Sequence, residues 1–266
     1  MFRKKKCGEE ESMELKILID GITNFVDNSQ LNTVNEIGLN RIFDYPIIGV
    51  ADAKDPMFVQ LQNPDVIGPH HLLPNDWLNN AKSVISYFLP FTNEVRQANS
   101  EQGLPAIEWV YARIEGEVFN NALRNYIVDI VKQNGSNANA PAVDSRFSVV
   151  DRRSNWSERH IAYIAGLGTF GLSKALITKK GCAGRFGSVV MDVQIPPTPR
   201  DYNGIYDYCT MCGECIRRCP SNAITQQGKN NSTCSNYIDK EILPRFAPRY
   251  GCGKCQTAVP CEFSLP

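Results

Sequence analysis

The cysteines constrain this chain more than any other residue type, because eight of its ten cysteines fall between residues 209 and 261. The first four, in the run from Cys209 to Pro220, are separated by two, two and three residues. This C-x2-C-x2-C-x3-C-P spacing is typical of ferredoxin loops that hold iron–sulfur clusters through cysteine thiolates. Two-residue gaps let one loop bring three thiolates to one cluster, whereas the fourth cysteine points toward a second cluster.

Eight cysteines supply four thiolates to each of two clusters, so the sequence predicts two [4Fe–4S] clusters. The predicted ligands of the first cluster are Cys209, Cys212, Cys215 and Cys261. The predicted ligands of the second cluster are Cys219, Cys234, Cys252 and Cys255. Cys261 is the least regular of the eight, because Pro260 precedes it instead of following it.

Clustered cysteines also occur in zinc sites and in disulfide-bonded proteins. Zinc ribbons use two C-x2-C pairs with a longer spacer, and the first four cysteines are too crowded for that pattern. Disulfides persist in oxidising compartments, whereas the lysine run at 4–6 lacks the apolar segment of an export signal. We therefore expect a cytoplasmic protein in which Cys7 is a spare thiol and Cys182 a small buried or turn residue.

Composition and charge set further limits on the class of protein. The 266 residues are 42% hydrophobic, which is enough for one large domain or two smaller ones. The formal net charge is zero, so no global attraction draws the chain to nucleic acid or to an anionic membrane. No apolar run approaches the roughly 20 residues that cross a bilayer, and no membrane association is expected. The proline-rich segment 195–199 predicts a linker, with a cofactor domain at 1–195 and an iron–sulfur domain at 196–266.

Hydrophobic periodicity predicts the regular elements. Helices are expected over 12–26 with Ser12 as N-cap, over 107–131 ending at Gly135, and from a capping box at 155–158 to Gly166. Strands are expected at 46–50, 81–89, 147–150, 175–178 and 187–192. Residues 52–76 are interpreted as a loop containing His70 and His71, which lack a third metal ligand nearby.

Three glycines form a pattern that looks like a dinucleotide fingerprint. Gly166, Gly168 and Gly171 read G-x-G-x-x-G, with Asp192 about twenty residues further on. The fingerprint needs a strand before it and a helix after it, whereas a capped helix is expected here before the glycines. A dinucleotide site is therefore disfavoured, but a glycine-rich loop can still let the backbone approach a bulky cofactor.

Several segments in a fixed order resemble one protein family, the epoxyqueuosine reductases, whose relatives include the catalytic cores of reductive dehalogenases. The resemblance covers most of the chain from about residue 70 onward and ends in the cysteine block. The segments that carry it are 79–90, 111–113, 150–151, 157–160 and 165–171.

The resemblance implies an α+β fold, in which a nitroreductase-like α/β cobalamin-binding domain precedes a ferredoxin-like module with two [4Fe–4S] clusters. It implies that the clusters pass single electrons to cobalt and that reduced cobalt reacts with the substrate. Asp151 matches the family's proton donor. Taken without the resemblance, the residue is equally consistent with an ion pair to a neighbouring arginine. The residues expected to contact the corrinoid are Arg159, His160, Gly166, Gly168 and Gly171, with a solvated helix face as the alternative for the first two.

The sequence departs from the family at Thr169 and Leu172, where an aromatic residue and a lysine are usual. The chain stops five residues after Cys261, so the helical-repeat region that grips tRNA is expected to be absent, and nucleic acid is not an expected partner. The predicted function is a cobalamin-dependent reduction of a small molecule, with electrons from an external donor such as ferredoxin or flavodoxin. The alternative is an electron-transfer protein without catalytic activity, or one linked to a flavin such as FMN.

Overall fold

The computed structural model describes residues 13–266, and a four-stranded antiparallel sheet lies at its centre. The strand order is β1 (Ile47–Asp52), β2 (Ser83–Pro90), β8 (Gly184–Met191) and β3 (Ala138–Asn139). β2 and β8 pair along their whole length, and every residue of β2 is buried. A strand buried on both faces must be covered from both sides, and the two flanking layers supply that cover.

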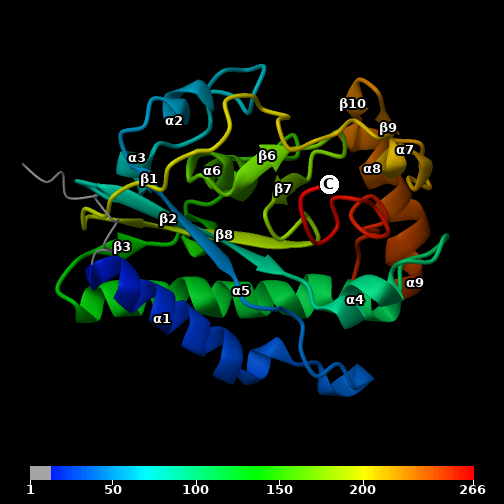
Figure 1. Cartoon of the computed structure of the whole chain (residues 1–266), viewed down its shortest axis with the longest axis horizontal. Helices are drawn as coiled ribbons and strands as arrows, with labels where there is room; N and C mark the ends of the chain where they lie inside the picture. Colours follow the sequence, from blue (N-terminus) through cyan, green and yellow to red (C-terminus); the bar gives the residue numbers. More distant parts are fainter. Residues whose placement is uncertain (1–12) are drawn as a thin grey trace, which may run out of the picture.

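One face of the sheet is covered by the long helix α5 (Ile107–Gln133) and by α1 (Met13–Asn28), which crosses it (Figure 1). Their apolar stripes form the main core, in which Ile22, Phe119 and Leu123 are fully buried. Both helices lie where periodicity predicts them. The proposed N-cap Ser12 and the spare thiol Cys7 lie outside the described residues.

The opposite face is covered by α6 (Glu158–Ile164), α2 (Met57–Gln60) and α3 (Pro74–Trp77). A second core there contains the buried rings of Phe58, Trp77 and Trp156. The smaller elements of this first part of the chain are η1 (Gln30–Asn32), η2 (Asn35–Ile37), α4 (Asn93–Ala98), η3 (Pro141–Val143), β4 (Val149–Val150), β5 (Arg153–Ser154), β6 (Gly168–Phe170) and β7 (Leu176–Thr178).

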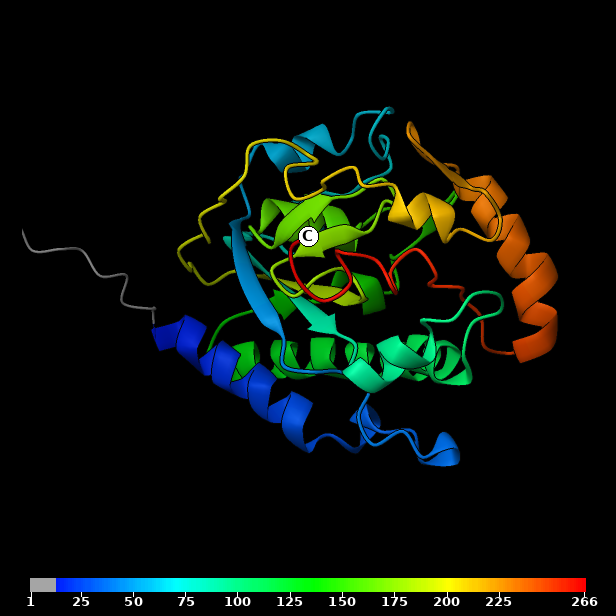
Figure 2. The ribbon, with the colours of Figure 1, turned by 45° about the vertical axis from the view of Figure 1, so that its right-hand side comes forward.

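The cysteine-rich part lies against one end of the sheet and of α5 (Figure 2). Its elements are short: α7 (Glu214–Arg217), β9 (Ile224–Thr225), β10 (Gly228–Lys229), α8 (Asn231–Tyr237), the π-helix η4 (Ile238–Ile242) and α9 (Leu243–Phe246). The terminal coil returns to the first part, where Glu262 forms a buried 2.8 Å ion pair with Arg96.

The proline-rich segment follows the edge of the sheet. Ile195 is fully buried, and its N–H donates to the Ser83 hydroxyl. Thr198 exchanges hydrogen bonds of 2.9 and 3.0 Å with the backbone of Val50 in β1. Packing therefore fixes this segment, and the division into 1–195 and 196–266 stays a prediction.

The glycine pattern follows α6 and does not open a helix. Gly166 has φ +82° and ends α6, and Gly168 then begins β6, which pairs with β7. The structure therefore supports the rejection of a dinucleotide fingerprint. The predicted capping box is wrong, because Ser157 occupies the N-cap and Asn155 instead binds the backbone of Ser148 and Arg146.

None of the helices within residues 13–266 has the length and apolar content to cross a membrane.

His71 is fully buried in the second core, where its ring stacks on Trp156 with centroids 5.9 Å apart. Its Nε2 accepts a 3.4 Å hydrogen bond from the Ser157 N–H, which a protonated ring could not accept. Burial accordingly lowers the pKa of His71 to about 4. The structure thus gives this histidine a packing role.

The depressed pKa of His71 predicts a loss of stability in mild acid. Below its ordinary pKa of 6.5 the unfolded chain binds a proton that the folded chain resists, until the folded pKa of about 4 is reached. We expect this one residue to remove roughly 2 kcal/mol of unfolding free energy between pH 7 and pH 5. Urea unfolding of wild type and His71→Asn at both pH values measures it. Equal losses in the two proteins would contradict the assignment.

Candidate functional site

A cavity of about 700 Å³ lies between the first part of the chain and the cysteine-rich part. Its volume is within the range of pockets that hold cofactors and small molecules. α5 contributes Trp109 and Arg113, the start of α6 contributes Glu158 and Arg159, and β8 contributes Arg185. The cysteine-rich part supplies the facing wall, which includes Tyr237, Tyr250, Cys219, Cys234, Cys252 and Cys255.

The structure brings the eight cysteines together in two groups of four. The first group lines a small second cavity beside Gly171 and Leu172, and consists of Cys209, Cys212, Cys215 and Cys261. The second group lies in the wall of the large cavity, and consists of Cys219, Cys234, Cys252 and Cys255. These are the two sets that ferredoxin-like interleaving predicts, and their role as cluster ligands stays a prediction.

The two cysteine groups do not have the arrangement of a single-ion site. Within residues 13–266, no three His, Cys, Asp or Glu side chains converge closely enough to hold one ion. A [4Fe–4S] cluster takes one thiolate at each iron, so its ligands lie further apart than those of one zinc ion. None of the nine described cysteines forms a disulfide.

Buried polar contacts fix the loop that carries Cys252 and Cys255. Lys254, between them, is 1% exposed, and its Nζ donates to the backbone and side-chain oxygens of Asn99 at 3.3 and 3.0 Å. Arg218 Nε donates to the Lys254 carbonyl at 3.0 Å. These hydrogen bonds therefore connect the loop of Cys252 and Cys255 to the residue before Cys219 and to the segment after α4.

Cys182 contacts Cys261 through both its backbone and its side chain. It is buried as predicted, its N–H donates to the Cys261 carbonyl at 2.9 Å, and the two sulfur atoms are 3.9 Å apart. The backbone contact holds the least regular of the predicted cluster ligands at the small cavity.

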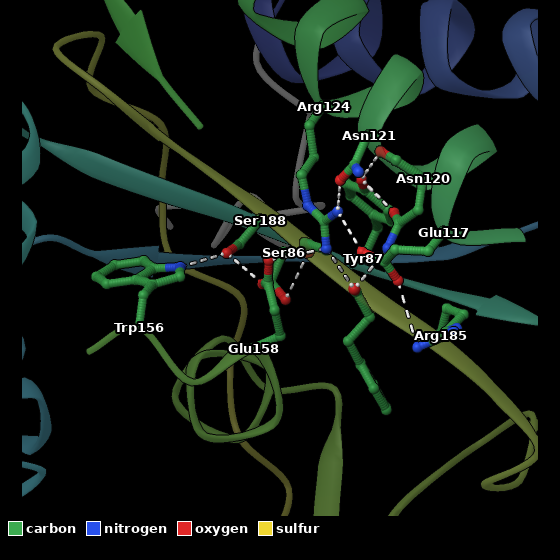
Figure 3. A network of polar contacts seen from close by, with 12 residues as sticks. Ser86, Tyr87, Glu117, Asn120, Asn121, Arg124, Trp156, Glu158, Arg185 and Ser188 are labelled. Atoms are coloured by element: carbon green, nitrogen blue, oxygen red, sulfur yellow. Dashed lines mark hydrogen bonds and ion pairs between the residues drawn. The ribbon is translucent and has the colours of Figure 1, made fainter. Parts of the chain in front are cut away.

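A network of buried charges forms the floor of the large cavity (Figure 3). Arg124 is 2% exposed and forms ion pairs with Glu117 at 2.8 Å and with Glu158 at 3.1 Å. The Ser188 hydroxyl donates to Glu158 at 2.5 Å and accepts from the Trp156 indole N–H at 2.9 Å. α5, α6 and β8 each contribute to the network, so it links both layers to the central sheet.

The two carboxyl groups on Arg124 have opposite pKa shifts. Burial disfavours ionisation of Glu117, but Arg185 and Arg124 together outweigh burial and lower its pKa. Burial raises the pKa of Glu158, and Arg124 and Ser188 only partly offset it. A pair of acids separated in this way is a recurrent arrangement for proton transfer. In the sequence, Glu158 was part of the predicted capping box and of the segment 157–160 that carries the family resemblance, but it was not predicted as a site residue.

Asp151, the expected proton donor, does not line the cavity, and this role stays a prediction. It occupies the turn of the β4–β5 hairpin with φ +48°, followed by Arg152 with φ +64°. Two successive left-handed residues make a tight turn, which projects its tip into solvent. Val149 and Val150 are 59% and 50% exposed, so β4 is not the buried strand that the apolar run suggested. Only the base of the hairpin, at Phe147 and Ser154, lines the cavity.

The alternative role of Asp151, an ion pair with a nearby arginine, finds no partner in Arg153 or Arg159. Arg153 donates to the carbonyls of Pro64 and Ile67, and Arg159 donates to the carbonyl of Lys174.

Arg159 and His160 point in different directions from α6. Arg159 lines the large cavity, as the prediction of a cofactor contact requires. His160 instead packs on Phe170 with ring centroids 4.8 Å apart, and its Nδ1 hydrogen-bonds the Ser157 hydroxyl at 2.8 Å. Burial lowers the pKa of His160 to about 3, so this partly buried ring is neutral. The predicted contact between His160 and a cofactor is not what this geometry provides.

The three glycines do not line the large cavity either. A Cβ on Gly168 would lie 2.0 Å from the Ile177 carbonyl oxygen, so this residue permits the close pairing of β6 and β7. Gly166 packs against Thr198 and Pro199, and Gly171 lies near Cys209 at the small cavity. Gly166 and Gly168 thus lie in close backbone contacts and Gly171 lies beside the first cysteine group, and contact of this loop with a corrinoid stays a prediction.

Fold and cysteine site together define the class of the chain: an α+β iron–sulfur protein with a [4Fe–4S] module. A family model, the 4Fe-4S binding domain Fer4, matches residues 203–225. The fold is that of an epoxyqueuosine reductase solved with an epoxyqueuosine-modified tRNA-Tyr stem loop, with a TM-score of 0.55 at 17% identity, covering 93% of this chain and 65% of that one. A reductive dehalogenase structure has a TM-score of 0.50 at 14% identity, covering 72% of this chain and 27% of that one.

The sequence is similar to particular curated proteins, each named epoxyqueuosine reductase. The protein of Cyclobacterium marinum is 26% identical over 205 residues, which are 73% of this chain and 63% of the relative. The protein of Vibrio cholerae is 30% identical over 120 residues, or 41% of this chain and 31% of the relative. The chain thus spans about 63% of the Cyclobacterium relative. The resemblance and the fold class that the sequence predicted are confirmed.

Proposed function

We propose that this chain is a cobalamin-dependent iron–sulfur reductase. The observation that carries the proposal is that one wall of the large cavity contains four cysteines, while the other walls contain aromatic and charged side chains. A group in the cavity would lie next to the second cluster. Electron transfer and substrate chemistry would then share one enclosed space.

The residues present fit a corrinoid. The cavity is about 700 Å³, and its aromatic side chains, among them Trp109 and Tyr237, offer flat apolar surface to a macrocycle. Its arginines offer N–H donors to the amide oxygens at the ring edge. When bound, a corrinoid supplies a cobalt centre that accepts electrons one at a time and reacts with the substrate.

The chain itself would supply the electron path. Cys212 of the first group is exposed, so an external donor such as ferredoxin or flavodoxin could reach that cluster. Leu172 and Ile224 form one apolar cluster against which cysteines of both groups pack, including Cys209 and Cys234. The second group opens into the cavity. We therefore propose that electrons pass from residues 196–266 into a cavity built largely by residues 1–195, and that the thiolates work in a reducing compartment such as the cytoplasm.

We propose a small molecule as the substrate. The neutral net charge of the chain agrees with this choice. The expectation that nucleic acid is not a partner has lost its support, however, because the curated relatives are epoxyqueuosine reductases and one structural neighbour was solved with a tRNA stem loop. A modified nucleoside in tRNA is therefore the second candidate substrate. A stem-loop binding measurement separates the two, since only the second candidate requires binding.

Metal analysis and a cobalamin titration test the proposal. We expect about eight iron and eight acid-labile sulfide per chain after anaerobic purification, from two four-ligand clusters. When cobalamin is added to the protein, the absorption spectrum of the cobalamin should shift toward the base-off form. One zinc or only about four iron would contradict the two-cluster prediction. Tight binding of FMN without cobalamin would favour the electron-carrier alternative, which the names of the relatives do not support.

A further inference from the structure

The large cavity contains more positive than negative side chains. Five basic residues line it, whereas only two carboxylates do. The basic residues are Arg113, Arg124, Arg159, Arg185 and Lys229, and the carboxylates are Glu117 and Glu158. Arg124 pairs with both carboxylates, which leaves four other cations in the lining.

Two of the remaining cations face the second cysteine group. Lys229 hydrogen-bonds Cys234 and lies near Cys255. Arg159 also interacts favourably with Cys255. A four-thiolate cluster carries net negative charge, and these two residues are placed to balance it.

Arg113 and Arg185 are the two remaining cations, and Glu117 is the carboxylate that they share with Arg124. Arg185 shares Glu117 with Arg124, at 3.3 Å, and donates a hydrogen bond to the Arg113 carbonyl. The Arg113 guanidinium stacks over the Tyr250 ring at 4.8 Å and favours the ionised form of Glu117 electrostatically, but within residues 13–266 it forms no ion pair of 4 Å or less. Gly251 packs closely against the Arg113 side chain, so this residue is held at the cavity wall.

The two guanidinium groups destabilise each other in this arrangement. Burial and then the proximity of Arg113 lower the pKa of Arg185 to about 10. Arg185 Nε is buried and has no hydrogen-bond partner within the described part of the chain. A buried donor without an acceptor is costly, and a guanidinium pair binds an oxyanion through several charge-assisted hydrogen bonds.

We propose that Arg113 and Arg185 form a subsite for an oxyanion, and that the substrate of the reductase carries a carboxylate or phosphate group bound there. The identification of the bound anion as a substrate rests on the proposed function, whereas the anion subsite itself rests on the two arginines. One other source has the same chemistry, because the nucleotide loop of cobalamin carries a phosphate. The experiment therefore has to separate the substrate's oxyanion from that of the cofactor.

Benzoate and benzamide are suitable probes, because they share a shape and differ in charge. Calorimetry on anaerobic cluster-loaded protein without cobalamin should give at least about tenfold tighter binding of benzoate. Arg113→Gln and Arg185→Gln should each remove this preference, whereas Arg113→Lys should retain part of it. Arg245→Gln is the matched control, because Arg245 forms an exposed ion pair with Glu241 away from the cavity.

Repeating the titration after saturation with cobalamin identifies the source of the oxyanion. A preference for benzoate that persists supports an anionic substrate. A preference that disappears supports the subsite with the cofactor phosphate as its occupant and overturns the inference about the substrate. If cobalamin does not bind but benzoate still does, the proposed function fails and the subsite stands.

Three results would overturn the subsite itself: no benzoate binding, equal binding of the two probes, or a preference that survives both glutamine variants. If Arg185→Gln does not fold, the Arg113 variants decide alone, since Arg113 has no ion pair to lose.

Discussion

The Arg124→Met variant is expected to lose about 3 kcal/mol or more of unfolding free energy, the lower end of the usual cost of breaking a buried ion pair. Arg124 is 2% exposed and is the shared partner of Glu117 and Glu158. Methionine fills similar space but leaves the Glu158 carboxylate with only the Ser188 hydroxyl as a partner. The lower end applies because Glu117 is 38% exposed and keeps Arg185 as a partner.

A matched control and a second substitution make this result interpretable. Arg245→Met removes an ion pair in which both side chains are 48% exposed, and should cost under about 1 kcal/mol. The double variant Arg124→Met with Glu158→Gln should recover part of the loss, because a neutral amide is cheaper to bury than a lone carboxylate. Urea unfolding under anaerobic conditions measures all three proteins. Equal midpoints for Arg124→Met and Arg245→Met would show that the buried network does not stabilise the fold.

The sequence predicted those elements whose local pattern and tertiary environment agree. α5 has apolar positions every three or four residues, and it lies where those positions require it. β2 is a continuous apolar run and is buried on both faces. The two groups of cysteines could also be predicted, because spacing within a loop limits which thiolates can meet.

The floor of the cavity could not be predicted, because its contacts depend on tertiary structure. Arg124 lies in the middle of a helix that was predicted from its apolar residues alone. Its partner Glu158 is 34 residues further along the chain, and Ser188 lies on a central strand. No local pattern indicates that these three side chains meet. The network therefore had no signature in the sequence.

Two other differences have local physical causes. The run 147–150 is apolar, but a tight turn at Asp151 and Arg152 makes it one arm of an exposed hairpin. The glycines at 166 and 168 suggested room for a cofactor, whereas neighbouring backbone fills that room. A glycine indicates that another group lies close to the backbone, but the sequence does not show whether that group is a cofactor or another part of the chain.

The proposed reduction consumes a proton as well as electrons. Glu158 lines the cavity and burial raises its pKa, but Arg124 and Ser188 bind its two oxygens. Asp151 has free access to solvent at the tip of a hairpin whose base lines the cavity. We propose that Asp151 is the proton donor and that it acts when the hairpin folds over an occupied cavity.

Asp151→Asn tests this role with little disturbance of the hairpin. Asparagine is favoured at left-handed turn positions, so the turn with φ +48° at residue 151 should persist. The amide cannot donate as an acid, and turnover of a surrogate substrate should fall on the order of a hundredfold, the usual scale for a general acid. Iron content and the cobalamin spectrum should match wild type. If this variant turns over normally while Glu158→Gln, with its clusters and cofactor intact, does not, then the proton comes from the buried network and Asp151 is only a turn residue.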